Sequence, residues 1–192
     1  MRIIEMVFTN MLSYREETVV DFSNPGVTII NGVNGAGKSS IPTILEELLY
    51  NKNSHGLTKA EIPHRYSKDQ SYSGSVMFEV DGAEYKLIKN VKSTTKLQLL
   101  KDGEDISGHT NTQTYQLVES IVGLDFSTFS KLVNQSMDSS LDFLSATDAK
   151  RKEFLVALQN LERYYKVEER IKEDKKVVDA ELTKASARVT TS

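Results

Sequence analysis

Eight consecutive residues near the start of the chain have the types and spacing that bind phosphate. Residues 32–39, GVNGAGKS, satisfy the P-loop pattern G-x-x-x-x-G-K-[ST] at every defined position. The glycines let backbone N–H groups reach phosphate oxygens, the lysine can neutralise the outer phosphates, and the serine hydroxyl suits Mg²⁺. The pattern therefore predicts nucleotide binding by Asn34, Gly35, Ala36, Gly37, Lys38, Ser39 and Ser40.

The residues on both sides of this motif supply the strand and the helix that a P-loop requires. Residues 27–30, VTII, are a short apolar run typical of a buried strand. Apolar residues recur at helical spacing between Ile44 and Leu49, so we expect a helix whose free N–H groups face the phosphate. Pro42 lies early in that helix, where we expect a small local distortion and no loss of phosphate binding. A chance lysine in a glycine-rich turn is the alternative, and these flanks argue against it.

Length, charge and composition limit the classes of protein that this chain can be. Its 192 residues suffice for one well-buried domain plus an appendage. The formal net charge is −3, so any nucleic-acid-binding surface must be local. Cysteine is absent, which removes disulfides and fits a reducing compartment. No apolar run approaches the roughly 18 residues of a membrane span, and the N-terminus lacks the apolar core of a signal peptide, so we expect a cytoplasmic protein with no membrane partner.

The remaining sequence up to residue 145 predicts a sheet followed by helices. Strand patterns occupy residues 2–9, 18–22, 75–80, 85–91 and 96–100, and Asp-Gly turn signals follow the third and the fifth. Helical patterns occupy residues 112–122 and 126–137. The polar segment 51–73 favours a solvated irregular loop, and the alternative is a surface near the nucleotide or near DNA. The histidines match no metal-site spacing; they are His55, His64 and His109.

From residue 146 to the end, the sequence changes to a heptad pattern. Eleven positions from 154 to 189 step by alternating three and four residues, and only Glu168 and Lys175 interrupt their apolar and aromatic character. This pattern predicts one strand of a coiled coil that projects on the order of 65 Å at 1.5 Å per residue, and a long surface helix is the alternative. We expect a P-loop lobe at 1–145 and the start of a coiled-coil helix at 146–192. The seam residues are Phe154, Ala157, Leu161, Tyr164, Ile171, Val178, Leu182, Ala185 and Val189.

The sequence lacks part of the machinery that a P-loop ATPase needs for hydrolysis. An acidic residue at the end of a strand must hold Mg²⁺ and polarise water, but no run of four apolar residues is followed by Asp-Glu. We therefore expect half of a nucleotide site, with the other half beyond a returning coiled-coil strand. A complete small P-loop kinase is a further alternative, which the missing acidic residue disfavours.

Half a P-loop domain followed by a coiled coil resembles the N-terminal lobe of the structural-maintenance-of-chromosomes (SMC) superfamily of ABC-type ATPases. Within it, the chain resembles the SbcC family, including large-phage counterparts. Residues 8–14 look like the family's opening strand and turn, with Asn10 and Ser13 at matching places, and Val133-Asn134-Gln135 resembles its Q-loop. Residues 143–144 and 150–155 resemble the run into the coiled coil. The sequence departs from the family at two places, where several members carry a basic residue or a glycine: Leu12 and Ser136.

This resemblance implies an α/β fold, in which a mixed sheet with a β-meander and helices forms the N-terminal lobe of the ATPase head. It implies ATP and Mg²⁺ as cofactors, with Lys38 and Gln135 catalytic and with Ser39 and Gln135 on the metal. The implied partners are the C-terminal lobe of the same ATPase, a second head in a homodimer, an SbcD-type nuclease subunit and DNA. The implied function is ATP-driven control of DNA-end processing in double-strand-break repair and recombination, in the cytoplasm at the nucleoid. An SMC-type chromosome-organising ATPase is the alternative.

Overall fold

The chain forms two compact units in the computed structural model, which describes residues 1–132, 147–158, 167–168, 170–176 and 178–179. The first unit comprises Met1–Asn134 and the second Gln135–Ser192, and each is described by itself. The domain boundary expected at residue 145 lies outside the described residues and stays a prediction.

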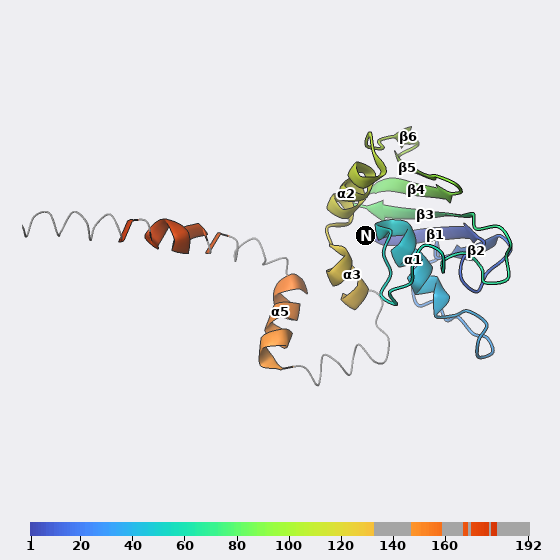
Figure 1. Cartoon of the computed structure of the whole chain (residues 1–192), viewed down its shortest axis with the longest axis horizontal. Helices are drawn as coiled ribbons and strands as arrows, with labels where there is room; N and C mark the ends of the chain where they lie inside the picture. The colour runs from blue at the N-terminus through green and yellow to red at the C-terminus, as the bar shows by residue number, and fades with distance from the viewer. Residues whose placement is uncertain (133–146, 159–166, 169, 177, 180–192) are drawn as a thin grey trace, which may run out of the picture. The chain divides into compact units, whose positions relative to one another are not determined.

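Among the described residues of the first unit, six strands form one sheet in the order β2-β1-β3-β4-β5-β6 (Figure 1). Every pairing between neighbouring strands is antiparallel. The Asp-Gly pairs at 81–82 and 102–103 have positive φ at both residues, as tight hairpin turns require. The strands expected at 2–9, 18–22, 75–80, 85–91 and 96–100 are confirmed. Their bounds are β1 Arg2–Thr9, β2 Thr18–Asp21, β3 Tyr72–Val80, β4 Ala83–Val91, β5 Thr95–Lys101 and β6 Glu104–Asp105.

Helices α1 (Ser40–Tyr50) and α2 (Asn111–Val122) pack on this sheet, and α3 (Phe126–Leu132) packs on α1. α1 packs on β3 and β4 and contacts both other helices, while α2 packs on β5. Fully buried side chains from α1 and β3 share one apolar core, which fixes the helix to the sheet. α2 ends at Gly123, whose left-handed φ of 73° explains the break expected there. The helix expected at 126–137 is confirmed up to residue 132, where this stretch of described residues ends.

One predicted strand does not form. Residues 27–30 are irregular, and the side chains of Val27 and Ile29 are 92% and 76% exposed. The β-branched run carries the local signal of a strand, but a strand also needs neighbouring backbone to pair with, and no described residue supplies it. The prediction of a buried strand at 27–30 is therefore wrong for this chain by itself. The sheet of the described strands is antiparallel throughout, where the resemblance implied a mixed one.

The described part of the second unit is helical. Helix α5 spans Asp148–Leu158, and residues 167–168, 170–176 and 178–179 are also in helical conformation. Two residues of the expected seam, Ile171 and Val178, are 60% and 59% exposed. Helical conformation agrees with the heptad pattern, whereas pairing into a coiled coil stays a prediction. Within the described ranges, no helix has the length and apolar character needed to cross a lipid bilayer.

Candidate nucleotide-binding site

The P-loop leads directly into the N-terminus of α1. Gly35 and Gly37 have φ values of +84° and +95°, in the left-handed region that glycine adopts without strain. Ser39 is the N-cap residue, and its side chain makes no capping hydrogen bond, which leaves the hydroxyl available to a ligand. Pro42 lies in the first turn of α1, where its missing N–H costs no intrahelical hydrogen bond. The loop-to-helix geometry that phosphate binding requires is therefore present.

Backbone carbonyl groups hold the Lys38 ammonium at the loop. Lys38 Nζ donates to the carbonyl oxygens of Gly32 at 2.7 Å and Val33 at 2.8 Å. The lysine side chain therefore folds back over the loop, and its charge lies beside the backbone on which a phosphate would rest. The loop residues before the buried Gly37 are exposed, including Asn34, Gly35 and Ala36.

The turn between β1 and β2 packs against the last glycine of the P-loop. A Cβ atom at Gly37 would lie 2.6 Å from the Cβ of Ser13, so no side chain fits there. Ser13 Oγ lies 3.0 Å from Ser40 Oγ, and the Tyr14 hydroxyl donates to the Gly37 carbonyl at 3.1 Å. The residues that resemble the family's opening turn therefore contact the P-loop itself.

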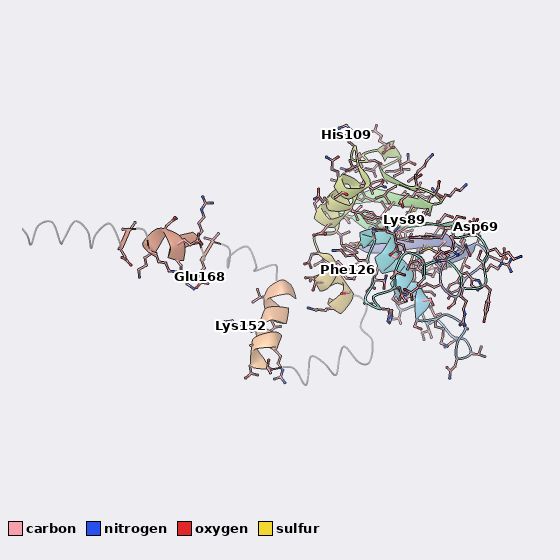
Figure 2. All side chains as sticks on the ribbon, viewed as in Figure 1. Asp69, Lys89, His109, Phe126, Lys152 and Glu168 are labelled. Atoms are coloured by element: carbon pink, nitrogen blue, oxygen red, sulfur yellow. The ribbon has the colours of Figure 1, made fainter. Side chains whose placement is uncertain are left out.

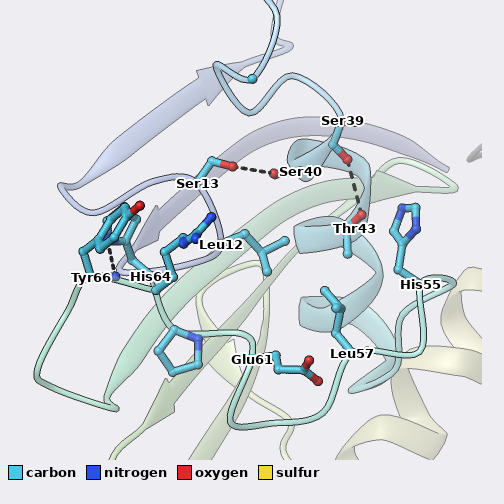
Figure 3. Close-up of a pocket in the computed structure, with 13 residues that line it drawn as sticks. Leu12, Ser13, Ser39, Ser40, Thr43, His55, Leu57, Glu61, His64 and Tyr66 are labelled. Carbon is cyan, nitrogen blue, oxygen red and sulfur yellow. Dashed lines mark hydrogen bonds between the residues drawn. The ribbon is translucent and has the colours of Figure 1, made fainter.

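A cavity of about 540 Å³ opens beside the P-loop (Figure 3). This volume lies within the range of small-molecule sites, roughly 300–1,000 Å³. Hydroxyl groups of the opening turn, the P-loop and α1 line it, together with imidazole, guanidinium and phenol groups of segment 51–73. The hydroxyl groups belong to Ser13, Ser39, Ser40 and Thr43, and the other groups belong to His55, His64, Arg65 and Tyr66.

Part of the polar segment 51–73 forms the second wall of this cavity. The Leu12 N–H donates to the Ile62 carbonyl at 2.7 Å, and the His64 N–H donates to the Asn10 carbonyl at 3.2 Å. These bonds tie the segment to the opening turn, and Ile62 is buried. The segment is irregular, as expected, and part of it lines a cavity beside the P-loop, while the alternative of a surface near the nucleotide stays a prediction. An apolar Ile-Pro pair within a polar stretch was the sequence signal for this contact.

A buried ion pair beneath α1 was missed by the sequence analysis. Lys89 of β4 (labelled in Figure 2) is 0% exposed, and its Nζ lies 2.7 Å from Glu47 Oε1 and 2.9 Å from Asn51 Oδ1. The Tyr72 hydroxyl donates to the same carboxylate oxygen at 3.0 Å. Burial lowers the pKa of Lys89, and Glu47 opposes this shift. The pair ties the C-terminal turn of α1 to the sheet. The sequence signal for the burial of Lys89 was its position among the inward-facing residues of the alternating strand β4.

The donor groups at the N-terminus of α1 fit the expected ATP and Mg²⁺. Ser39 is exposed and lines the cavity, so its hydroxyl can serve as a protein oxygen ligand alongside phosphates and water, the ligand set that Mg²⁺ prefers. The structure brings Lys38, Ser39 and Ser40 together at this point. In the part of the chain that the structure describes, no group of His, Cys, Asp and Glu residues could hold a metal ion. Gln135, the expected metal and γ-phosphate sensor, lies outside the described residues.

Comparisons with known proteins reach nearly the whole chain. The AAA_23 family model, described as an AAA domain, matches residues 5–190. A probable exonuclease subunit 2 of Escherichia phage T5 is 50% identical over 171 residues, which cover 89% of this chain and 28% of that protein. The SbcC component of the SbcCD nuclease of Bacillus subtilis is 28% identical over 185 residues, which cover 85% of this chain and 16% of that protein. The chain therefore spans less than a third of the length of either relative.

The fold also has a counterpart among solved structures. A chain from work on ATP-driven dimerization and DNA-stimulated activation of SMC ATPases aligns with a TM-score of 0.59 at 16% identity, covering 82% of this chain and 99% of that one. At this identity the likeness shows the fold, and it confirms the expected α/β architecture of the head lobe. Together with the P-loop geometry and the 50% identical relative, these matches show that the chain belongs to the AAA_23 family of AAA domains, as an SbcC-like ATPase of the SMC superfamily.

Proposed function

We propose that this chain is the ATP-binding half of the ATPase subunit of an SbcC-type nuclease complex, which processes DNA ends in double-strand-break repair and recombination. The observation that carries the proposal is the P-loop at the N-terminus of α1, open to a cavity of nucleotide size. The nuclease names of the 50% and 28% identical relatives support the nuclease context over a chromosome-organising role, which is the weaker alternative.

The P-loop residues divide the work of holding the nucleotide. Lys38 places its charge on the outer phosphates, and the backbone N–H groups of the loop and of the first turn of α1 donate to their oxygens. Ser39 Oγ binds Mg²⁺, which when bound neutralises charge on the β- and γ-phosphates. Gln135 responds to the metal and the γ-phosphate, and it precedes the expected coiled-coil helix closely enough to link the nucleotide state to head geometry.

An exposed apolar segment before the P-loop supports the dependence of hydrolysis on a second lobe. The side chains of Val27 and Ile29 are 92% and 76% exposed. Burial of each side chain of this size would contribute roughly 1.5–3 kcal/mol. In the proposed complete head, a strand of the C-terminal lobe pairs with residues 27–30, buries these side chains, and brings the acidic residue that this sequence lacks.

The wider assembly contains two heads, a nuclease and DNA. ATP binding pairs two heads as a homodimer, and this pairing controls an SbcD-type nuclease that docks near the base of the coiled coil. The complex acts on DNA ends in the cytoplasm, at the nucleoid. The relatives with nuclease names support this arrangement, and the matching fold of a chain from a study of SMC ATPases is compatible with it.

ATP turnover with and without the second lobe tests this function. The purified 192-residue chain should hydrolyse ATP negligibly, and addition of the C-terminal lobe should give turnover that Lys38→Ala abolishes. Lys68→Ala, which removes an exposed lysine, is the matched control and should retain turnover. Brisk turnover by the chain alone would contradict the half-site, and equal turnover in both variants would contradict the role of the P-loop.

A further inference from the structure

The Gly37 carbonyl accepts two hydrogen bonds at the end of the P-loop. The Ser40 N–H donates to it at 2.9 Å, and the Tyr14 hydroxyl donates at 3.1 Å. Gly37 is buried, so protein donors satisfy this carbonyl in place of solvent. The first bond belongs to the start of α1, whereas the second reaches in from the turn after β1.

The direction of this carbonyl sets the direction of the N–H that follows it. A trans peptide is planar, and its C=O and N–H groups point to opposite sides. Because the Gly37 carbonyl is directed at Tyr14, the Lys38 N–H is directed away from Tyr14. Within the described ranges this N–H has no hydrogen-bond partner, so it is available to a phosphate oxygen at the N-terminus of α1.

The glycine at this position leaves the orientation of the peptide to the hydrogen bonds that its carbonyl accepts, one from the Ser40 N–H and one from the Tyr14 hydroxyl. Gly37 has a φ of +95°, and glycine adopts positive and negative φ about equally readily. The close approach of Ser13 excludes any side chain that would restrict these angles. Packing therefore demands glycine at position 37, and the peptide after a glycine rotates easily. The hydrogen bond from Tyr14, which lies outside the loop, can set the direction of that peptide.

Tyr14 is itself held firmly in place. Its ring packs edge-on against buried Phe8, with centroids 5.1 Å apart and an interplanar angle of 73°. Its backbone exchanges two hydrogen bonds of 2.9 Å with Met11, across a turn in which Leu12 has a φ of 49°. Burial raises the pKa of the Tyr14 phenol, which keeps the hydroxyl protonated and able to donate.

We propose that Tyr14 is a positioning residue for nucleotide binding, whose hydroxyl holds the Gly37–Lys38 peptide so that the Lys38 N–H faces the phosphate. This inference rests on the proposed function of the P-loop. It adds to that function a residue outside the motif that sets the geometry of the loop.

Replacement of Tyr14 by phenylalanine removes the hydroxyl and retains the ring and its packing on Phe8. In the assembled ATPase head, Tyr14→Phe should weaken ATP binding roughly two- to tenfold, the effect of one neutral hydrogen bond. With isotopically labelled lysine, ATP should shift the Lys38 amide proton downfield in the wild-type head and shift it less in the variant. Tyr85→Phe is the control, because Tyr85 is buried in the core against Phe78, and it should bind ATP with wild-type affinity.

The outcomes separate this inference from the proposed function. If Lys38→Ala loses ATP binding while Tyr14→Phe keeps wild-type affinity and the full Lys38 amide shift, the positioning role alone is overturned. If the wild-type head binds no ATP, both proposals are overturned. If Tyr14→Phe binds ATP weakly and melts below Tyr85→Phe, yet keeps the full amide shift, the hydroxyl has only a packing role and the inference is again wrong.

Discussion

Gly37 meets two separate steric demands, whereas Gly35 meets one. Both residues have positive φ, at +95° and +84°. At Gly37 a Cβ would meet Ser13 at 2.6 Å, but at Gly35 no atom lies within 4 Å of the place where a Cβ would be. Substitution of Gly35 therefore tests backbone strain alone, whereas substitution of Gly37 tests backbone strain together with packing against the opening turn.

Alanine at these two positions should destabilise the chain unequally. Gly35→Ala should cost about 1–2 kcal/mol for a left-handed non-glycine residue. Gly37→Ala should cost more, because the contact with Ser13 must also be relieved, and Ser13→Gly in the same chain should recover part of the loss. Chemical denaturation of the three variants measures these differences. Equal losses in Gly35→Ala and Gly37→Ala would show that the opening turn does not pack on the P-loop in solution.

Gln135 should act after nucleotide binding. Gln135→Ala is expected to leave ATP affinity unchanged and to reduce ATP-driven head pairing or turnover, because the side chain is proposed to contact the metal and γ-phosphate side. Gln113→Ala, at the N-terminal cap of α2, is a control for loss of a glutamine elsewhere in the lobe. Steady-state ATP turnover of the completed ATPase measures the effect. Wild-type turnover in Gln135→Ala would show that Gln135 is not the sensor of the metal and the γ-phosphate.

At the scale of elements, local sequence patterns predicted the strands, turns and helix that depend on contacts between residues close in sequence. Alternation and Asp-Gly turns identified β3 and β4, and the glycine loop placed the start of α1. The strand at 27–30 was wrong because its formation depends on a partner strand that the described chain does not contain. The second wall of the cavity and the burial of Lys89 arise from contacts between distant segments. The local signals, an Ile-Pro pair and the inward position of Lys89 in β4, could not identify the partners of those contacts.

The Lys89–Glu47 pair anchors the far end of the helix that begins at the P-loop. Lys89→Met should destabilise the lobe by about 3–5 kcal/mol, because it leaves a buried carboxylate without its cation. The double variant Lys89→Met/Glu47→Leu should regain much of this loss, since neither charge then remains buried. The free energy of unfolding tests both, and a double variant as unstable as the single one would show that the charges do not act as a pair.

At the scale of the whole molecule, the second unit presents exposed apolar residues along the expected seam. Ile171 and Val178 are largely exposed along the expected seam, and rows of exposed apolar side chains favour association. We expect this helix to pair with a returning strand, a copy of itself or the nuclease subunit.

Charged substitutions in the seam should abolish this pairing. Leu161→Asp with Ile171→Asp should lower the measured molecular mass of the assembly, while Lys176→Asp, outside the seam, should leave it unchanged. Light scattering coupled to chromatography makes the measurement. A wild-type chain that stays monomeric, with freely exchanging amide hydrogens at 165–192, would contradict the coiled-coil prediction.

The affinity of the assembled head for ATP, measured by calorimetry in wild type and Lys38→Ala, tests the central claim most directly. Within the described part of the chain, the ammonium donates to carbonyl oxygens of its own loop, so its removal should leave the fold and the melting temperature intact. Loss of a charge-assisted contact with phosphate should weaken ATP binding roughly 10- to 150-fold. An unchanged affinity in Lys38→Ala would mean that the loop does not bind the nucleotide, and the proposed function would be wrong.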